Sequence, residues 1–173
     1  MASKKLTFRV FKIESEKLSK TGLDLIKELR DRMVNSDIES RIISIREGSD
    51  DNEVLSFSKY VCTPGSEYFY GVIMRLKPAK ELQALPDNFL KMNSLNEDEL
   101  LELKEIEGKV ICSSLYHFFI KGNILITDLQ QINPISCFSN YLNKLLLGSS
   151  YIFYPYIVAE NLKLKDESTL KSG

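Results

Sequence analysis

The sequence contains no tryptophan and a single histidine, His117, which limits the catalytic chemistry available to it. A serine or cysteine nucleophile activated by histidine would have to use His117, and no GxSxG motif accompanies it. No glycine-rich phosphate-binding motif of the dinucleotide or P-loop type occurs either. His117 lies in the apolar stretch Tyr116–Phe119, which is typical of a structural histidine in a strand. We therefore predict no catalytic residue and no cofactor.

Cysteine is also scarce, with Cys62, Cys112 and Cys137 widely separated and no CxxC pair among them. This spacing does not fit a zinc site or a disulfide framework, so neither is predicted. The N-terminus lacks the apolar core of a secretion signal, and no apolar run is long enough to span a membrane. These absences favour a cytoplasmic protein with three free thiols and no membrane partner.

The 173 residues, of which 43% are hydrophobic, suit one domain with a substantial core. We expect a single α/β domain over residues 1–159. The stretch 160–173 is polar and lacks a core pattern, so it is either a tail or the start of a missing segment.

Hydrophobic periodicity predicts an α+β fold with a single, largely antiparallel or mixed sheet and about three packed helices. The expected order is β-α-β-β-β-α-β-β-α-β. The strands are expected at 5–13, 39–46, 54–61, 68–76, 109–120, 124–129 and 151–158, and the helices at 21–34, from 96 onward and at 135–146. Thr21 and Asp24 suggest a capping box for the first helix, and Gly148 suggests the C′ position of the last. Pro155 predicts that the final strand is an edge strand or carries a bulge.

Aromatic residues gather on the expected strands, and they support the leading prediction of a non-enzymatic interaction module. We expect it to form a homo-oligomer or to join a larger assembly through a Tyr- and Phe-rich sheet surface. The strand 151–158 and the loop 77–94 are the candidate contact elements. The candidate interface residues are Tyr68, Tyr70, Tyr151, Phe153, Tyr154 and Tyr156.

The uneven charge distribution supports an alternative, a nucleic-acid-binding domain. The chain has a net charge of −1, which disfavours a dedicated nucleic-acid binder. Residues 1–46, however, hold eleven Lys or Arg against seven Asp or Glu, so a basic face is conceivable there. The candidate contacts are Arg9, Lys12, Lys20, Lys27, Arg30, Arg32, Arg41 and Arg46. A third hypothesis is an enzyme whose site combines dispersed carboxylates with His117.

One stretch carries a family resemblance. It consists of Tyr70–Leu76, then Leu85-Pro86, an acidic helix, the hairpin Tyr116–Thr127 and a helix containing Phe138 to Leu146. Over residues 70–147 this pattern resembles the N-terminal regions of RexA-like phage-exclusion (abortive-infection) proteins and of other proteins of bacterial defence islands and prophages. The resemblance implies a role in phage–host conflict, with DNA or a partner protein contacted by the module. It rests on no catalytic motif, so it assigns no functional residue.

Overall fold

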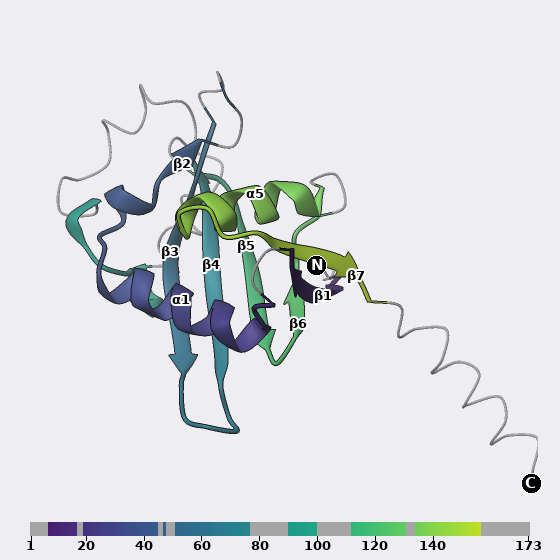
Figure 1. The fold of residues 1–173 in the computed structure, drawn as a ribbon. Coiled ribbons are helices and arrows are strands. Elements are labelled where there is room, and N and C mark those ends of the chain that lie inside the picture. The colour runs from purple at the N-terminus through teal and green to yellow at the C-terminus, as the bar shows by residue number, and fades with distance from the viewer. Residues whose placement is uncertain are drawn as a thin grey trace, which may run out of the picture.

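The computed structural model describes residues 7–16, 19–44, 47, 51–76, 90–99, 112–130 and 134–156. These residues form a seven-stranded, curled sheet with helices packed against it (Figure 1). The strands are β1 (Arg9–Ser15), β2 (Ile43–Ser44), β3 (Asn52–Val61), β4 (Tyr68–Leu76), β5 (Cys112–Lys121), β6 (Ile124–Thr127) and β7 (Tyr151–Pro155). The helices are α1 (Gly22–Val34), the short 3-10 helix η1 (Glu39–Arg41) and α5 (Ile135–Leu145). No helix in this described part is long and apolar enough to cross a membrane.

The strands follow the spatial order β2-β3-β4-β5-β6-β1-β7, and every neighbouring pair is antiparallel. This confirms the predicted α+β class and the largely antiparallel sheet. Strands β2 to β6 lie in chain order as four successive antiparallel pairs, and β1 lies between β6 and the last strand. As Pro155 predicted, β7 lies at an edge of the sheet.

The main core lies between the sheet and the helices α1 and α5, which cover the same face (Figure 1). Leu25, Ile26 and Leu29 of α1 are at most 1% exposed, and they pack against the inward side chains of the strands. From α5, Phe138 and Leu142 enter the same core. The 3.6-residue period of these apolar positions explains why both segments form helices that lie flat on the sheet.

A second apolar cluster covers the opposite face of β3 and β4. Val54, Val72 and Met74 are fully buried there, beneath Leu95 of the segment 90–99. The Leu95 amide donates a 2.9 Å hydrogen bond to the Ser56 carbonyl, which fixes this segment to β3. These two strands are therefore buried on both faces.

Carbonyl groups from three segments hold the buried Arg41. One of them belongs to Leu55, beside a β-bulge at which the register between β3 and β4 shifts between Leu55 and Phe57. The Arg41 guanidinium, fully buried, donates to the Leu55 carbonyl at 2.9 Å and to the carbonyls of Ser36 and Asn93. The expected strand 39–46 is therefore only partly right: residues 39–41 form η1, and only Ile43–Ser44 are seen as strand.

Helix α1 begins where the sequence indicates. The Thr21 amide and hydroxyl both donate to the Asp24 carboxylate, at 2.7 and 2.9 Å, and these bonds lower the pKa of Asp24. Gly22 then meets the turn of the β5–β6 hairpin, because a Cβ at this position would lie 1.8 Å from the Gly122 carbonyl oxygen. The absent side chain thus allows the helix to start directly on the hairpin.

The end of α5 differs from the prediction. Leu146 is the C-cap, so Leu147 and not Gly148 follows at C′, and both adopt positive φ (54° and 93°). The Gly148 amide donates to the Asn143 carbonyl at 3.0 Å. Leu147 therefore carries the left-handed conformation without the advantage of glycine, and its side chain is 86% exposed.

The remaining boundaries agree to within a few residues. Tyr68–Leu76 matches its predicted strand at both ends, while the β5–β6 turn is one residue shorter than expected because Lys121 pairs with Ile124. Of the expected acidic helix, residues 97–99 are helical and the rest lies outside the described residues. The same is true of most of the 77–94 loop and of the tail 160–173.

Candidate interaction surface

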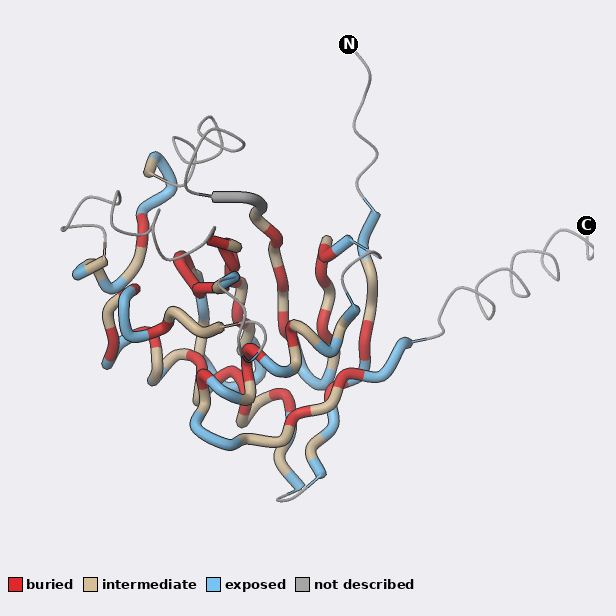
Figure 2. Tube along the Cα trace, turned by 90° about the horizontal axis from the view of Figure 1, so that it is seen from above, coloured by how far each residue is buried: buried red, intermediate tan, exposed pale blue. Residues whose placement is uncertain are grey.

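The face of the sheet opposite the helices carries a row of apolar side chains across four strands. In β1, Phe11 and Ile13 enter the main core, so the alternation points Val10 and Lys12 to the other side. Figure 2 shows this alternation of buried and half-buried residues along the strands. The pairing register aligns the same alternation in the neighbouring strands. We call the following residues the outer face: Val10, Lys12, Glu14, Phe119, Ile124, Ile126, Ile152 and Tyr154.

The apolar members of the outer face belong to neither core cluster of the described residues. Val10, Phe119, Ile124, Ile126 and Ile152 are half-buried, and Tyr154 is 47% exposed. Just beyond the strands, Phe8 is 59% and Tyr156 is 47% exposed. The Tyr156 amide donates to the Val10 carbonyl at 2.9 Å, which continues the β1–β7 pairing past Pro155. An apolar sheet face of this kind is a typical site of protein contact.

Aromatic rings extend this face onto β4. Tyr68 stacks on Phe119 with ring centroids 5.6 Å apart, and Tyr70 stacks on His117 at 6.0 Å. The Tyr70 hydroxyl lies 2.6 Å from His117 Nδ1. Burial raises the pKa of the Tyr70 phenol, and the Asp128 carboxylate raises it further, so the phenol is protonated at neutral pH. Tyr70 is thus the favoured donor, and His117 contributes a hydrogen-bonded ring to this end of the surface.

The edge of β7 is closed to strand addition along most of its length. The Tyr151 amide donates to Asn143 Oδ1, and the Tyr151 carbonyl accepts from Asn143 Nδ2 and Ser139 Oγ, all at 2.9 Å. At the other end Pro155 has no N–H to offer. At the opposite edge, β2 has two residues and pairs only with Asn52 and Glu53 of β3. Because exposed edges are the usual templates for strand pairing, the β7 edge is the one at which contact through the face of the sheet is favoured.

The structure separates the six predicted interface residues into two groups. Tyr68 and Tyr70 are half-buried at the end of the outer face, Tyr154 is an exposed member of it, and Tyr156 is exposed beside it. Tyr151 and Phe153, by contrast, point into the main core and are at most 5% exposed. The sequence analysis missed the aliphatic members of the face. Runs such as Ile124-Leu125-Ile126 are apolar on both sides, so they do not reveal which side is open.

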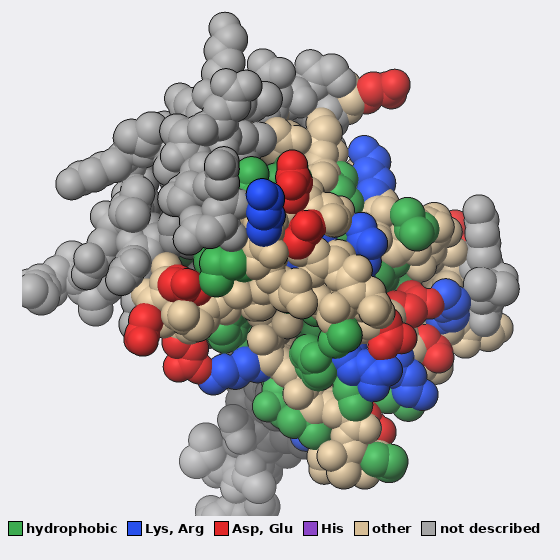
Figure 3. Space-filling view, turned by 90° about the vertical axis from the view of Figure 1, so that its left-hand side faces the viewer, with side chains coloured by type: hydrophobic (Ala, Val, Ile, Leu, Met, Phe, Trp, Pro, Cys, Tyr) green, Lys and Arg blue, Asp and Glu red, His purple; other side chains and the backbone are tan. Residues whose placement is uncertain are grey.

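The predicted basic residues do not form one open patch. Arg41 is fully buried, and burial, with Arg32 nearby as a like charge, lowers its pKa to about 10. Arg9 lies 5.0 Å over the Phe11 ring and donates to the Leu129 carbonyl. On the side shown in Figure 3, basic side chains are mixed with acidic and apolar ones.

Three of the other six basic residues are paired with carboxylates. Lys12 pairs with Glu14 at 3.0 Å, Lys20 with Glu28, and Arg30 with Asp31 at 2.6 Å. Lys27 is exposed, Arg32 is half-buried, and Arg46 lies outside the described residues. These pairs reduce the positive potential available to a phosphate backbone.

Within the described part of the chain, no group of three or more His, Cys, Asp or Glu side chains is placed to hold a metal ion. In comparisons with protein-family profiles, curated proteins and solved structures, nothing matches this chain. A functional assignment therefore starts from the fold and its surfaces.

Proposed function

We propose that this protein is a non-enzymatic interaction module that pairs with a second copy of itself through the outer face. The observation that carries this proposal is the row of six apolar side chains, spread over β5, β6, β1 and β7, that no described segment packs into a core. Burying such surface against a partner removes apolar area from water, which is the main driving force of association.

The charges of the outer face favour a second copy as the partner. Lys12 and Glu14 stand side by side on β1 and form an ion pair at 3.0 Å. The charges on β1 therefore balance, and Lys121, opposite Ile124, adds one exposed cation at the hairpin end of the face. A twofold axis between two copies would allow Lys12 of one copy to approach Glu14 of the other.

The β7 edge further restricts how the two copies can meet. With Tyr151 bonded to Asn143 and Pro155 lacking a donor, continuation of the sheet from one copy to the next is disfavoured. Face-to-face packing of the two sheets, at about 10 Å separation, uses the apolar residues instead.

The proposal is tested by charge substitution on the face. Ile126→Lys and Tyr154→Lys each place an ammonium group in the proposed contact, and each is expected to raise the dimer dissociation constant roughly 30-fold or more. Val34→Lys is the matched control, because Val34 is an exposed apolar residue (56%) on α1, away from the outer face. Sedimentation velocity measures the association of each variant, and thermal unfolding confirms that each is folded. Equal association of all three variants and the native protein would refute the assignment.

The same samples test the nucleic-acid alternative. Binding through Lys and Arg releases counterions from phosphates, so it weakens steeply as salt rises, whereas apolar face-to-face packing does not. Co-purifying nucleic acid that dissociates at high salt would favour the alternative. A role of the module in phage–host conflict is supported by the sequence resemblance alone, and plaque counts on cells with and without the protein test it.

A further inference from the structure

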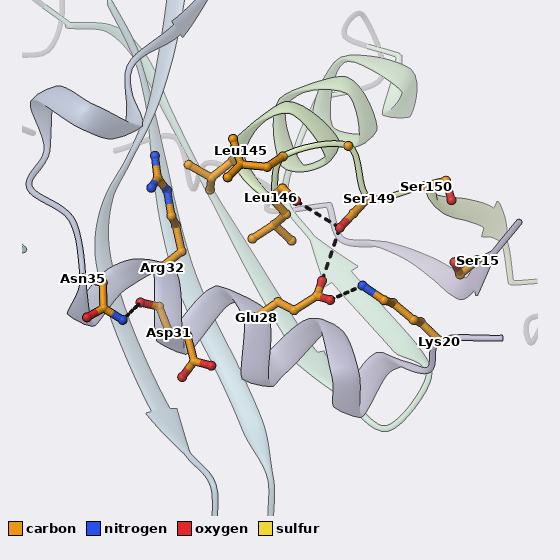
Figure 4. A pocket seen from close by; sticks show the side chains of 12 residues that line it. Ser15, Lys20, Glu28, Asp31, Arg32, Asn35, Leu145, Leu146, Ser149 and Ser150 are labelled. Carbon is orange, nitrogen blue, oxygen red and sulfur yellow. Dashed lines mark hydrogen bonds and ion pairs between the residues drawn. The ribbon is translucent and has the colours of Figure 1, made fainter. Parts of the chain in front are cut away.

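A pocket of about 500 Å³ opens between α1 and the C-terminal turn of α5, on the helix side of the sheet (Figure 4). It is therefore separate from the outer face. Its volume lies in the range of about 300–1,000 Å³ that small-molecule sites usually occupy. Its lining combines leucines from one helix with charged side chains from the other.

The leucine side of the pocket comes from the end of α5. Leu145 is 1% exposed and Leu146 packs partly against the main core, so both are held firmly. Leu147, which also lines the pocket, is 86% exposed and adopts a positive φ. A ligand that covers Leu147 would remove exposed apolar surface from water, which favours binding.

The carboxylates of the pocket are already occupied. Glu28 pairs with Lys20 through one oxygen, and its other oxygen accepts from the Tyr151 hydroxyl at 3.0 Å and from Ser149 (Figure 4). Asp31 pairs with Arg30 at 2.6 Å. Neither acid is therefore placed to neutralise a further cation in the pocket.

Arg32 is the lining residue whose charge is not balanced. Among the described residues it has no ion-pair partner; its guanidinium donates to the Ser40 carbonyl at 3.0 Å, and its Nε has no hydrogen-bond partner. The Arg41 guanidinium lies near enough for Arg32 to lower its pKa as a like charge, in addition to the larger effect of burial. This end of the pocket therefore has an excess of positive charge next to an apolar wall.

We propose that this pocket binds a small amphiphilic anion, whose carboxylate pairs with Arg32 and whose apolar part packs on Leu146 and Leu147. Guanidinium binds carboxylate through parallel hydrogen bonds, and the leucines would cover a short hydrocarbon chain or ring. An amphiphilic cation is disfavoured because Glu28 and Asp31 are already paired.

The test uses three probes of equal chain length: octanoate, octylammonium and octanol, each below the concentration at which it forms micelles. Amide chemical shifts are followed by NMR. We expect saturable binding of octanoate with shifts around Leu146 and Ser149, and affinity at least tenfold weaker for the other two probes. Equal affinity for all three, or shifts confined to the outer face, would overturn the proposal.

Two variants then separate the pocket charge from general electrostatics. Arg32→Gln is expected to weaken octanoate binding about tenfold or more, with octanol unaffected. Lys27→Gln is the control, because Lys27 is an exposed cation on the same helix that does not line the pocket. Equal loss in both variants, or no loss in Arg32→Gln, would exclude a specific role for Arg32. If Arg32→Gln does not fold, the ranking of the three probes on the native protein decides the question.

Discussion

Tyr141→Phe removes one buried hydroxyl that forms hydrogen bonds with two backbone groups. The Tyr141 hydroxyl accepts a 2.6 Å hydrogen bond from the Leu55 amide at the β-bulge, and it donates a 3.0 Å bond to the Arg41 carbonyl. The side chain is 3% exposed, and burial raises the pKa of the phenol, so water does not replace it and its proton is retained at neutral pH.

The expected cost follows from leaving these two groups without partners. Each buried unsatisfied group costs about 1–3 kcal/mol, so the variant is expected to lose roughly 2–5 kcal/mol of its free energy of unfolding. Urea denaturation measures this loss, and Tyr60→Phe, which alters an exposed tyrosine outside the outer face, serves as the control with an expected change within about 0.5 kcal/mol. A loss below about 1 kcal/mol in Tyr141→Phe would show that the bulge is not held by this hydroxyl.

Three further substitutions test the helix ends. Gly22→Ala places a Cβ 1.8 Å from the Gly122 carbonyl oxygen, so it is expected to lower the free energy of unfolding by more than about 2 kcal/mol. Gly65→Ala is expected to lower it clearly less, because a Cβ there has open space and only the φ of +84° disfavours alanine. Leu147→Asn is expected to raise stability by about 0.5–1 kcal/mol in urea denaturation, because Asn tolerates positive φ better and an 86% exposed Leu has little packing to lose; a loss of stability would contradict this. Asp24→Asn is expected to lower stability near neutral pH by about 0.5–1 kcal/mol. Because the pKa of Asp24 is lowered in the folded protein, its carboxylate stabilises the fold above the unfolded pKa of about 3.9, and this stabilisation is lost as pH falls through the folded value. The free energies of unfolding of the native protein and Asp24→Asn should therefore converge in strong acid. A difference that stays constant with pH would contradict the capping role.

Local patterns predicted much of the fold because they depend on neighbours in sequence. The strand Tyr68–Leu76 was placed at its observed ends, since its alternation and the flanking turn are both local signals. The predicted start of α1, at Thr21, is one residue before the observed start, because Thr21 and Asp24 form the capping box that marks the N-cap. Pro155 predicted that the last strand is an edge strand or carries a bulge, and β7 lies at the sheet edge.

What the sequence did not reveal depends on contacts between distant segments. Residues 39–41 were joined to a strand because of the isoleucines that follow them. In the structure they form η1, since the Arg41 guanidinium donates to carbonyls of Leu55, Ser36 and Asn93. Leu147 takes a left-handed conformation that sequence reasoning reserves for Gly148. The spatial order of the strands, with β1 next to β7, has no signal in a single sequence.

The candidate surface was predicted only in part, for a related reason. Aromatic content pointed to the sheet, yet Tyr151 and Phe153 face the core while Ile124 and Ile126 face outward. The two sets differ by one position in strands that are apolar on both sides, and only the pairing register decides between them.

The most direct test of the proposed function is light scattering coupled to size-exclusion chromatography on the native protein over a wide range of concentrations. With no Trp and eight Tyr, the protein absorbs weakly in the ultraviolet, so bound nucleic acid would be conspicuous in the same trace. We predict a concentration-dependent dimer, free of nucleic acid, whose mass changes little with salt. A monomer at every concentration would contradict pairing through the outer face.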